Sequence, residues 1–481
     1  MSGMRGIVMS LVAALVAASA AAESDLVWLE KAELPLEGQA FPDAKPLYGR
    51  LSARHEGVVP EKVWRLSQSA TGLLIRFETD ARFFEVRWRV ANEHPQDPLI
   101  PEAGLSGIDV YRLEGREGWK FQGNKRYWSN RYGAKRGDAP VPGEAHVDWR
   151  PGAAGLIYLP TRGTVLDFKV GVPKGCRFKA YAHEKGRLRP VVHYGTSIVH
   201  GGCASRPGLT FTAQVGRSLD IPYVNLGFSG AGQMETVMAD VMAEVEASLY
   251  VVDCVWNMNP KLVEERTEAF LRRLKARRPE TPILLAEGAN SRESRLPTND
   301  ALYAVYAKLK NADPKMWAHL HYLAEEDILL RGDLEQTHDF CHPNDYGMMR
   351  MARSFEKAIG GILKLEPREW GVEEALRSHD MIRRAGGFRT VDELQAGLSD
   401  VRELYREFSC SNFVGPDTPP IRLYGSDLKS RDWIHHGLFA VNFKRVADAK
   451  GASNVELVMP NAPGRFRNDW AFIADLFGLM L

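Results

Sequence analysis

The feature that most constrains the fold of this chain is a regular alternation of short apolar segments with longer amphipathic ones between residues 187 and 365. Alternation of this kind is typical of a doubly wound parallel sheet that is flanked by helices. The sequence predicts strands at 191–194, 223–226, 249–254, 283–286 and 319–323, and helices at 211–219, 234–246, 262–277, 301–309 and 346–363. Ligands of such sheets bind beyond the carboxyl ends of the strands, so functional side chains are expected there.

The region before this alternation, residues 23–186, has a different pattern. Residues 73–78 and 84–90 alternate apolar and polar positions, which is the period of a half-buried strand. Residues 156–159 and 165–170 add two further strand candidates, with turn residues between them. Short strands without long helices predict an all-β sandwich domain in front of the α/β domain.

The N-terminus has the order of a secretory signal sequence. Arg5 precedes an apolar run over residues 7–18, and the small residues at 20–22 follow it. This run is too short to cross a bilayer, and no other stretch approaches the roughly 18 continuous apolar residues that a membrane span needs. We therefore expect a signal peptide over residues 1–22, a secreted or periplasmic mature protein, and no membrane anchor.

The last region, residues 366–481, has no pattern to which a role can be assigned. Residues 391–408 predict an amphipathic helix, and the capping-box sequence at 390–393 would start it. A Pro-rich stretch from Gly415 then leads into short strand candidates. The sequence therefore predicts a mixed C-terminal extension after the α/β domain of residues 187–365.

The charge of the chain is almost balanced, with 62 Lys and Arg against 61 Asp and Glu and a formal net charge of +1. Such a chain has no global electrostatic footprint for nucleic acid or for an anionic membrane. One local basic cluster is interpreted as a solvated helix end, where cations favour the helix dipole. Its members are Arg272, Arg273, Lys275, Arg277 and Arg278.

The five cysteines allow two interpretations. Export permits disulfides, but the number is odd and the spacing shows no framework of bridges. A bridge between Cys203 and Cys341 would tie two active-site loops together, whereas the interpretation that we favour is free, mostly buried thiols. No CxxC or paired-His spacing is present, so no metal site is expected.

The strongest candidate for chemistry is Ser197, which follows the first predicted strand in the Gly-bordered segment Tyr194–Gly202. A serine in this place can expose its hydroxyl at the carboxyl edge of the sheet. A serine hydroxyl is a weak nucleophile and needs a base within hydrogen-bond reach. The alternative from this segment alone is a Gly/Ser/Thr-rich loop without a catalytic role.

The candidate base is His342, which follows the last predicted strand and stands three residues after Asp339. A carboxylate bonded to one imidazole nitrogen fixes the tautomer and stabilises the imidazolium that forms in the reaction. Pro343 stiffens the chain directly after the histidine. His338 is a second candidate base, but it adjoins Asp339 and is poorly placed to share its face. The alternative is an ordinary helix-entry loop.

Two loops between these residues are candidates for stabilising an oxyanion. The segment Asn225–Gly232 follows the second predicted strand, and its glycines leave backbone N–H groups free to point into a cleft. The segment Asp253–Asn259 follows the third strand, and an asparagine amide there can donate a hydrogen bond. Each loop alone could be a plain turn, but all four loops carry a suitable group at a strand end.

The ordered set of blocks resembles the SGNH (GDSL-like) hydrolases over residues 188–363. The resemblance makes Ser197 the nucleophile, and it implies an oxyanion hole built from the Ser197 N–H, the Gly230 N–H and the Asn257 side chain, with Asn259 as a competitor for Asn257. The upstream segment Gly107–Tyr111, with Trp119 after it, resembles the Gly-x-Asp-Leu-Tyr β-domain that precedes some of these enzymes.

This sequence departs from the family pattern around two of the blocks. Thr196 stands where the family's Gly-Asp-Ser-Leu block has Asp, and Ile198 stands for the Leu. Val255 and Met258 replace the usual Gly and Asp around the asparagine. None of these changes removes a group that performs the chemistry, but they reshape the pocket. His200 is a candidate pocket residue, with a structural role as the alternative that we favour.

The implied function is that of a serine ester hydrolase that works by acyl transfer to water. This mechanism uses only side chains and backbone groups, so no metal or cofactor is needed. An exported SGNH enzyme with a β-sandwich resembles carbohydrate esterases that remove acetyl groups, which makes a small-molecule or polysaccharide ester the expected partner. The alternatives are a lipase acting on lipid esters and a glycan-binding protein whose hydrolase domain is only a scaffold.

Overall fold

The computed structural model of the chain describes residues 25–91, 100–115, 118–125, 140–184, 186, 188–292, 295–328 and 332–366, together with the backbone of 421–424 and 455–458. The predicted signal peptide, the predicted helix at 391–408 and Cys410 lie outside the described residues. The chain divides into two compact units, residues 1–370 and 371–481. In the second unit, β16 (Ile421–Tyr424) and β17 (Val455–Val458) form a parallel pair.

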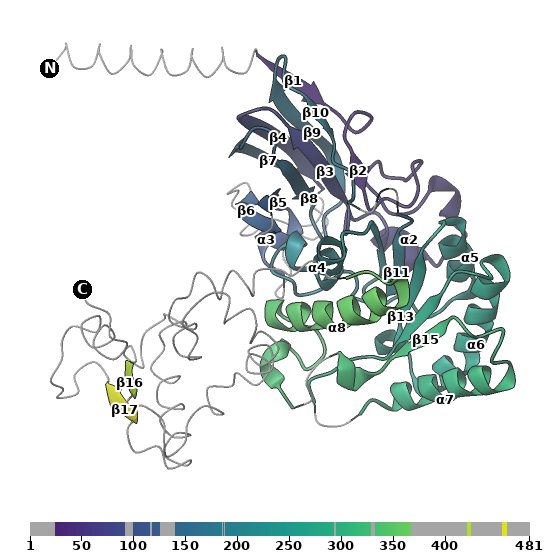
Figure 1. Cartoon of the computed structure of the whole chain (residues 1–481). Coiled ribbons are helices and arrows are strands. Elements are labelled where there is room, and N and C mark those ends of the chain that lie inside the picture. Colours follow the sequence, from purple (N-terminus) through teal and green to yellow (C-terminus); the bar gives the residue numbers. More distant parts are fainter. Residues whose placement is uncertain are drawn as a thin grey trace, which may run out of the picture. The chain divides into compact units, whose positions relative to one another are not determined.

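The N-terminal part of the first unit is built from two antiparallel sheets, as the sequence predicts (Figure 1). The first sheet has the order β1 (Leu26–Leu29), β9 (Val165–Pro173), β4 (Phe83–Val90) and β7 (Val141–Asp148). The second has the order β10 (Phe178–Ala180), β3 (Leu74–Thr79), β8 (Ala154–Tyr158), β5 (Ile108–Leu113) and β6 (Trp119–Lys125), and β2 (Leu36–Glu37) pairs with β3. Two short helices, α2 (Glu61–Leu66) and α3 (Glu102–Leu105), lie between the strands.

The alternating pattern of the sequence decides which side chains face the core of this sandwich. In β4 every second residue is buried, which places Phe84, Val86 and Trp88 on the inner face. Phe77 from the other sheet meets Phe84 edge to face, with ring centroids 5.3 Å apart. Apolar residues of both sheets therefore form one core, which the hydrophobic effect stabilises.

The second part of the first unit is a five-stranded parallel sheet with helices on both faces, and this confirms the predicted fold class. The strand order is β12 (Tyr223–Gly227), β11 (Val191–Gly195), β13 (Leu249–Asp253), β14 (Ile283–Ala286) and β15 (Leu320–Leu323). The helices are α4 (Phe211–Ser218), α5 (Thr236–Glu244), α6 (Pro260–Arg277), α7 (Pro297–Ala312) and α8 (Asp345–Leu363).

Two hydrophobic clusters show which helices cover which face of the parallel sheet. One cluster contains Met238 of α5, Phe270 of α6 and Leu302 of α7. The other contains Phe211 of α4 and Phe355 of α8. The strands between them are buried on both faces, which explains why they read as almost continuous apolar runs in the sequence.

Four of the five helices begin at different residues from those predicted: α6 starts two positions earlier and α8 one position earlier, and the other two have an identifiable cause. The first, α5, starts at Thr236 rather than at 234, because Met234 has a φ of +54° and Glu235 is extended. The second, α7, starts four positions earlier than predicted, at Pro297. Proline has a fixed φ that suits the first turn, where its missing N–H costs no hydrogen bond.

The Gly-x-Asp-x-Tyr segment lies on β5, at the junction between the sandwich and the α/β part. Asp109 is fully buried, and its carboxylate accepts hydrogen bonds from Arg206 Nη1 at 2.7 Å and from the Gly208 N–H at 2.8 Å. The Tyr111 hydroxyl accepts from the same Arg206 nitrogen at 2.8 Å. This motif therefore holds the segment of Arg206 and Gly208, which follows the turn that carries Ser197.

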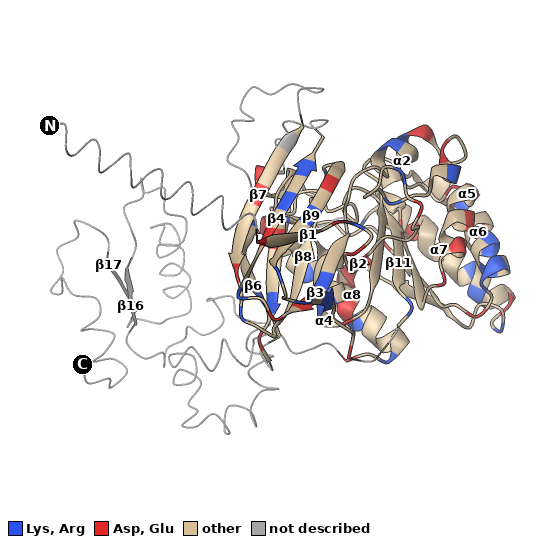
Figure 2. Ribbon diagram, turned by 90° about the horizontal axis from the view of Figure 1, so that it is seen from above, with Lys and Arg blue, Asp and Glu red and all other residues tan. Residues whose placement is uncertain are grey.

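The basic cluster on α6 is paired with acidic side chains. Arg273 and Arg277 both bind Asp240 of α5, at 2.7 and 2.6 Å, and Arg272 binds Glu268 at 2.8 Å. In the ribbon of Figure 2, positions of Lys and Arg (blue) and of Asp and Glu (red) lie next to one another in the region of α5 and α6. These pairs agree with the interpretation of a solvated helix face. Among the described helices, none is both long and apolar enough to cross a membrane.

Candidate active site

Ser197 lies in the first turn after β11, at the carboxyl end of this strand, which pairs with β12 and β13 in the parallel sheet. The backbone makes one helical turn here, with the His200 N–H bonded to the Thr196 carbonyl at 3.0 Å and the Gly202 N–H bonded to the Ser197 carbonyl at 2.8 Å. Thr196 and Ile198 are buried, whereas Ser197 is half-buried. The turn therefore anchors its neighbours in the core and leaves the Ser197 side chain accessible.

The structure brings Ser197, His342 and Asp339 together. Ser197 Oγ lies 2.8 Å from His342 Nε2, and His342 Nδ1 lies 2.7 Å from Asp339 Oδ2. Asp339 Oδ1 also accepts the backbone N–H of Cys341 at 3.1 Å and that of His342 at 2.7 Å. One carboxylate thus fixes both the fold of this loop and the orientation of the imidazole. His342, not His338, faces Ser197.

The same contacts keep Asp339 ionised. Burial by itself would raise the pKa of this carboxyl, but the hydrogen bonds from the backbone and ring of His342 outweigh it and hold the pKa below its ordinary value. An ionised Asp339 is the form that can accept the Nδ1 proton of His342, which leaves Nε2 free to accept a proton from Ser197.

Gly230 lies in the loop after β12 and has a φ of +62°, a conformation that side chains other than glycine rarely adopt. Within the part of the chain that the structure describes, no hydrogen bond occupies the backbone N–H of Ser197 or that of Gly230. Both groups are therefore available as donors. The Gly230 carbonyl is held on its other side by Lys62 Nζ of α2, at 2.8 Å.

The structure separates the two asparagines that compete for the third oxyanion donor. Asn259 is the N-cap of α6, and its Oδ1 accepts the Leu262 N–H at 2.9 Å. Asn257 instead turns its side-chain amide toward the loop after β12, where Nδ2 donates to the Ala231 carbonyl. Asn257 is thus the residue of the two that lies beside Gly230.

His200 is buried among hydrogen-bonding side chains rather than exposed in an open pocket. Its side chain is almost fully buried, with 1% of the residue exposed. Nδ1 lies 3.1 Å from Ser229 Oγ, and Nε2 lies 2.8 Å from Ser69 Oγ. Ser69 belongs to the N-terminal sandwich of residues 23–186, which we call the β-domain; the α/β part of residues 187–365 is the hydrolase domain. This placement agrees with the structural role that the sequence analysis favours for His200.

Among the described residues, one group of side chains has the spacing of a metal site: Asp339, Cys341 and His342, whose ligand atoms lie within 4.8 Å of one another. Burial and the nearby charge of Asp339 raise the pKa of the Cys341 thiol to about 12. A thiol must lose its proton to bind a metal, so Cys341 is a poor ligand here. Cys176, Cys203, Cys254 and Cys341 are all free thiols in the structure.

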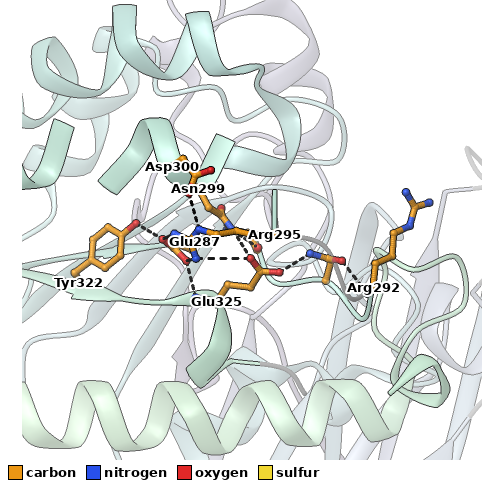
Figure 3. Close-up of polar contacts among 9 residues, drawn as sticks. Glu287, Arg292, Arg295, Asn299, Asp300, Tyr322 and Glu325 are labelled. Atoms are coloured by element: carbon orange, nitrogen blue, oxygen red, sulfur yellow. Dashed lines mark hydrogen bonds and ion pairs between the residues drawn. The ribbon is translucent and has the colours of Figure 1, made fainter. Parts of the chain in front are cut away.

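A buried polar network lies in the segments that follow β14 and β15 (Figure 3). Glu287, just after β14, accepts hydrogen bonds from Arg295 Nη1 at 2.9 Å and from the Glu325 N–H at 2.7 Å. The Glu325 carboxylate in turn accepts from Asn299 Nδ2 at 2.8 Å. Both carboxylates are almost fully buried. The network joins the carboxyl ends of β14 and β15, and β15 precedes the loop that carries Asp339 and His342.

The loop that follows β14 also contacts the loop that carries Asp339 and His342. Ser291 Oγ lies 2.9 Å from Thr337 Oγ1, and the Arg292 guanidinium lies 4.9 Å from the centre of the Phe340 ring. Figure 3 shows Arg292 pointing away from the buried carboxylates. The sequence does not reveal this network, because its members come from the segments after two different strands, which only the folded sheet brings together.

Comparison with protein families agrees with this geometry. Residues 188–360 match the GDSL-like lipase/acylhydrolase family, and residues 26–178 match the family described as the N-terminus of SGNH-hydrolase-type esterases. A comparison with curated protein sequences found no match.

Two solved structures resemble the first unit. A GDSL-like lipase from Bacteroides ovatus ATCC 8483 is 27% identical, with a TM-score of 0.61, over 71% of this chain and 99% of its own. The salicylyl-acyltransferase SsfX3 from a tetracycline biosynthetic pathway shares the fold at 18% identity and a TM-score of 0.57, over 71% and 99% of the two chains. The chain therefore carries a GDSL-like (SGNH) hydrolase domain over residues 188–360, with a GxDLY β-domain over residues 26–178 in front of it.

Proposed function

We propose that this protein is an exported serine esterase that hydrolyses acyl esters, foremost acetyl esters of carbohydrates, with Ser197 as nucleophile, His342 as base and Asp339 as the residue that orients it. The observation that carries the proposal is the continuous hydrogen-bonded chain from Ser197 Oγ to His342 Nε2 at 2.8 Å and from His342 Nδ1 to Asp339 at 2.7 Å. Family membership supports a hydrolase or esterase.

The proposed reaction has two steps. His342 Nε2 takes the proton of Ser197 while Oγ attacks the ester carbonyl, and the oxyanion forms against the N–H groups of Ser197 and Gly230 and the amide of Asn257. Collapse breaks the bond to the alcohol, which leaves with the proton from His342. Water that has lost a proton to His342 then attacks the acyl-enzyme, releases the carboxylic acid and restores Ser197.

The substrate class rests on the combination of a predicted signal peptide, a β-sandwich and an SGNH domain, which resembles carbohydrate esterases. Lipid esters are the second substrate class, because acyl-chain length depends on pocket shape. The third hypothesis is a glycan-binding protein without activity. The contacts among Ser197, His342 and Asp339 argue against it, because glycan binding alone does not require a histidine that is oriented by a carboxylate toward a serine hydroxyl.

The test measures hydrolysis of 4-nitrophenyl acetate by the wild type, by Ser197→Ala and by Ser248→Ala. Ser248 is a matched control, because its hydroxyl bonds the Pro190 carbonyl at 3.2 Å, at the amino end of the sheet. We expect the activity of Ser197→Ala to fall by a factor of about 10⁴ or more and that of Ser248→Ala to stay unchanged. Equal rates for the wild type and Ser197→Ala, or no hydrolysis at any acyl length, would contradict the proposal.

Substrate class is tested separately. Acetate released from an acetylated oligosaccharide, with 4-nitrophenyl acetate preferred over the octanoate, supports a carbohydrate acetylesterase. A preference for octanoate and release of fatty acid from an emulsified triglyceride would instead support the lipase hypothesis.

A further inference from the structure

The β-domain contributes a loop to the proposed active site. This loop follows β8 and is anchored by the Thr161 N–H, which donates to the Gly104 carbonyl at 3.0 Å. It packs directly on the turn that carries Ser197, because a Cβ added to Gly201 would lie only 2.6 Å from Thr161 Cγ2. The residue after Thr161 is Arg162, which the sequence analysis did not single out.

Arg162 joins the two loops that hold the proposed nucleophile and the proposed oxyanion donor. Its Nη1 donates to Ser229 Oγ and lies 3.1 Å from His200 Nδ1. Its Nη2 lies 3.1 Å from the place where a Cβ of Gly202 would be. Ser229 directly precedes Gly230, and the Gly202 N–H is bonded to the Ser197 carbonyl. One guanidinium group therefore contacts both loops.

A second guanidinium group, that of Arg50, contacts the end of β12 and the other side of the His200 ring. Arg50 is 1% exposed, and its Nη1 donates to the Gly227 carbonyl at 2.7 Å, where β12 ends. Its Nη2 lies 3.1 Å from His200 Nε2, on the side of the imidazole opposite Arg162. Burial, and then the charge of Arg162, lower the pKa of Arg50 to about 9. Both arginines belong to the β-domain, and both hold the loop that carries Gly230.

We propose that Arg162 is a positioning residue of the active site, through which the β-domain fixes Ser229 and thereby aims the Gly230 N–H at the oxyanion. The inference rests on the proposed esterase function. An oxyanion donor acts on charge that develops in the transition state, so its position affects the chemical step more than substrate binding. The hydrolase domain is then incomplete without the β-domain.

The size of the expected effect follows from the role. Removing an oxyanion donor outright typically costs a factor of about 10² to 10³ in kcat. Arg162 acts on this donor through one intervening residue, so its loss should cost less. We expect kcat of Arg162→Gln to fall about 10- to 100-fold with little change in KM. Arg162→Lys, which keeps a donor and the charge, should recover part of the loss.

The control is Arg76→Gln. Arg76 is also a β-domain arginine that binds the hydrolase domain, since its Nη2 donates to Asp220 at 2.8 Å. Its other hydrogen bonds within the described residues go to the Tyr181 and Ala182 carbonyls, away from the Ser197 and Gly230 loops. If Arg162 were only one of several contacts between the domains, both variants would lower Tm and neither would lower kcat selectively. We expect instead that Arg76→Gln leaves kcat unchanged and that Arg162→Gln lowers it.

A double-mutant cycle tests whether Arg162 acts through Ser229. If it does, Arg162→Gln and Ser229→Ala lower kcat by similar factors, and the double variant loses little more than either single one. The affinity for phenylboronic acid, which forms a tetrahedral adduct on a nucleophilic serine, should fall in parallel with kcat. If Arg162→Gln fails to fold, Arg162→Lys and Ser229→Ala carry the same comparison.

The outcomes separate this inference from the proposed function. Wild-type activity that depends on Ser197, together with an unchanged kcat in Arg162→Gln, would overturn the role of Arg162 and leave the esterase standing. Losses that multiply in the double variant would also overturn it. Activity that does not depend on Ser197 would overturn both.

Discussion

At the scale of single residues, Gly230 has the most demanding backbone of the proposed site. Its φ of +62° lies in the left-handed region, and an added Cβ would meet only the flexible end of Lys62, at 2.6 Å from Nζ. The requirement for glycine here therefore comes mainly from the backbone conformation. A left-handed residue with a side chain costs about 1–2 kcal/mol.

Gly230→Ala should therefore lower the free energy of unfolding by about 1 kcal/mol and also lower kcat, because relief of the strain moves the N–H donor. The matched control is Gly152→Ala in the β-domain, where φ is +79° and nothing lies within 4 Å of the added Cβ. Urea unfolding and ester hydrolysis check both. An equal kcat in the two variants would count against Gly230 as an oxyanion donor.

The residues of the proposed site divide into two classes by how well the sequence reveals them. Ser197, His342 and Asp339 each follow a predicted strand, and the carboxyl ends of parallel strands meet at one edge of a sheet. Sequence order was therefore enough to place them together. Arg162 and Arg50 come from a different domain, and no local pattern reports a contact between domains, so the sequence did not reveal them.

At the scale of elements, the apolar strands of the parallel sheet were predicted closely because they are buried on both faces. Four of the five strands differ from their predicted ranges by one residue at an end, and β14 has its predicted range. In the β-domain, β3, β4, β8 and β9 were predicted and the other strands were not, including β5, although the motif Gly107–Tyr111 was noted. The polar groups of Asp109 and Tyr111 in this motif bind Arg206 of the hydrolase domain instead of facing solvent. The segment therefore lacks the apolar/polar alternation by which a half-buried strand is predicted.

The buried network of Figure 3 predicts an effect on stability at this scale. Arg295→Met removes the cation that binds Glu287, a carboxylate that is 1% exposed. An uncompensated buried charge is strongly destabilising, so we expect a loss of about 3 kcal/mol in the free energy of unfolding. The measurement is urea unfolding monitored by tryptophan fluorescence.

Arg273→Met is the control for this prediction. Arg273 also binds a carboxylate, Asp240, but its side chain is 52% exposed and Arg277 binds the same acid. Exposed pairs of this kind contribute little to stability. An equal loss in the free energy of unfolding for the two variants would show that the buried pair of Arg295 and Glu287 contributes no more to stability than an exposed pair.

At the scale of the whole molecule, the contact between the two domains of the first unit includes a titratable group. His183 lies close to two carboxylates, at 3.2 Å from Asp220 and 3.1 Å from Glu37. Burial lowers the pKa of His183, but the hydrogen bonds to Asp220 and Glu37 outweigh it and raise the pKa to about 9. The folded protein therefore holds this proton more tightly than the unfolded chain does.

The sign of the pH dependence follows from this shift. The contribution of His183 is fully present below the unfolded pKa of about 6.5 and is lost as the pH rises through about 9. We expect the difference in Tm between the wild type and His183→Gln to be larger at pH 6 than at pH 9.5. A difference that stays constant or grows with pH would show that His183 is not held as a cation.

The central claim is that Ser197 forms a covalent acyl-enzyme, and trapping tests it most directly. Diethyl 4-nitrophenyl phosphate should phosphorylate Ser197 Oγ and release 4-nitrophenolate, and the adduct is stable because water attacks it slowly. Mass spectrometry of the digested protein should place a single diethylphosphoryl group on the peptide that contains Ser197, and none on that peptide in Ser197→Ala. A wild-type protein that stays unmodified while it hydrolyses esters, or an adduct at another residue in both proteins, would contradict the account.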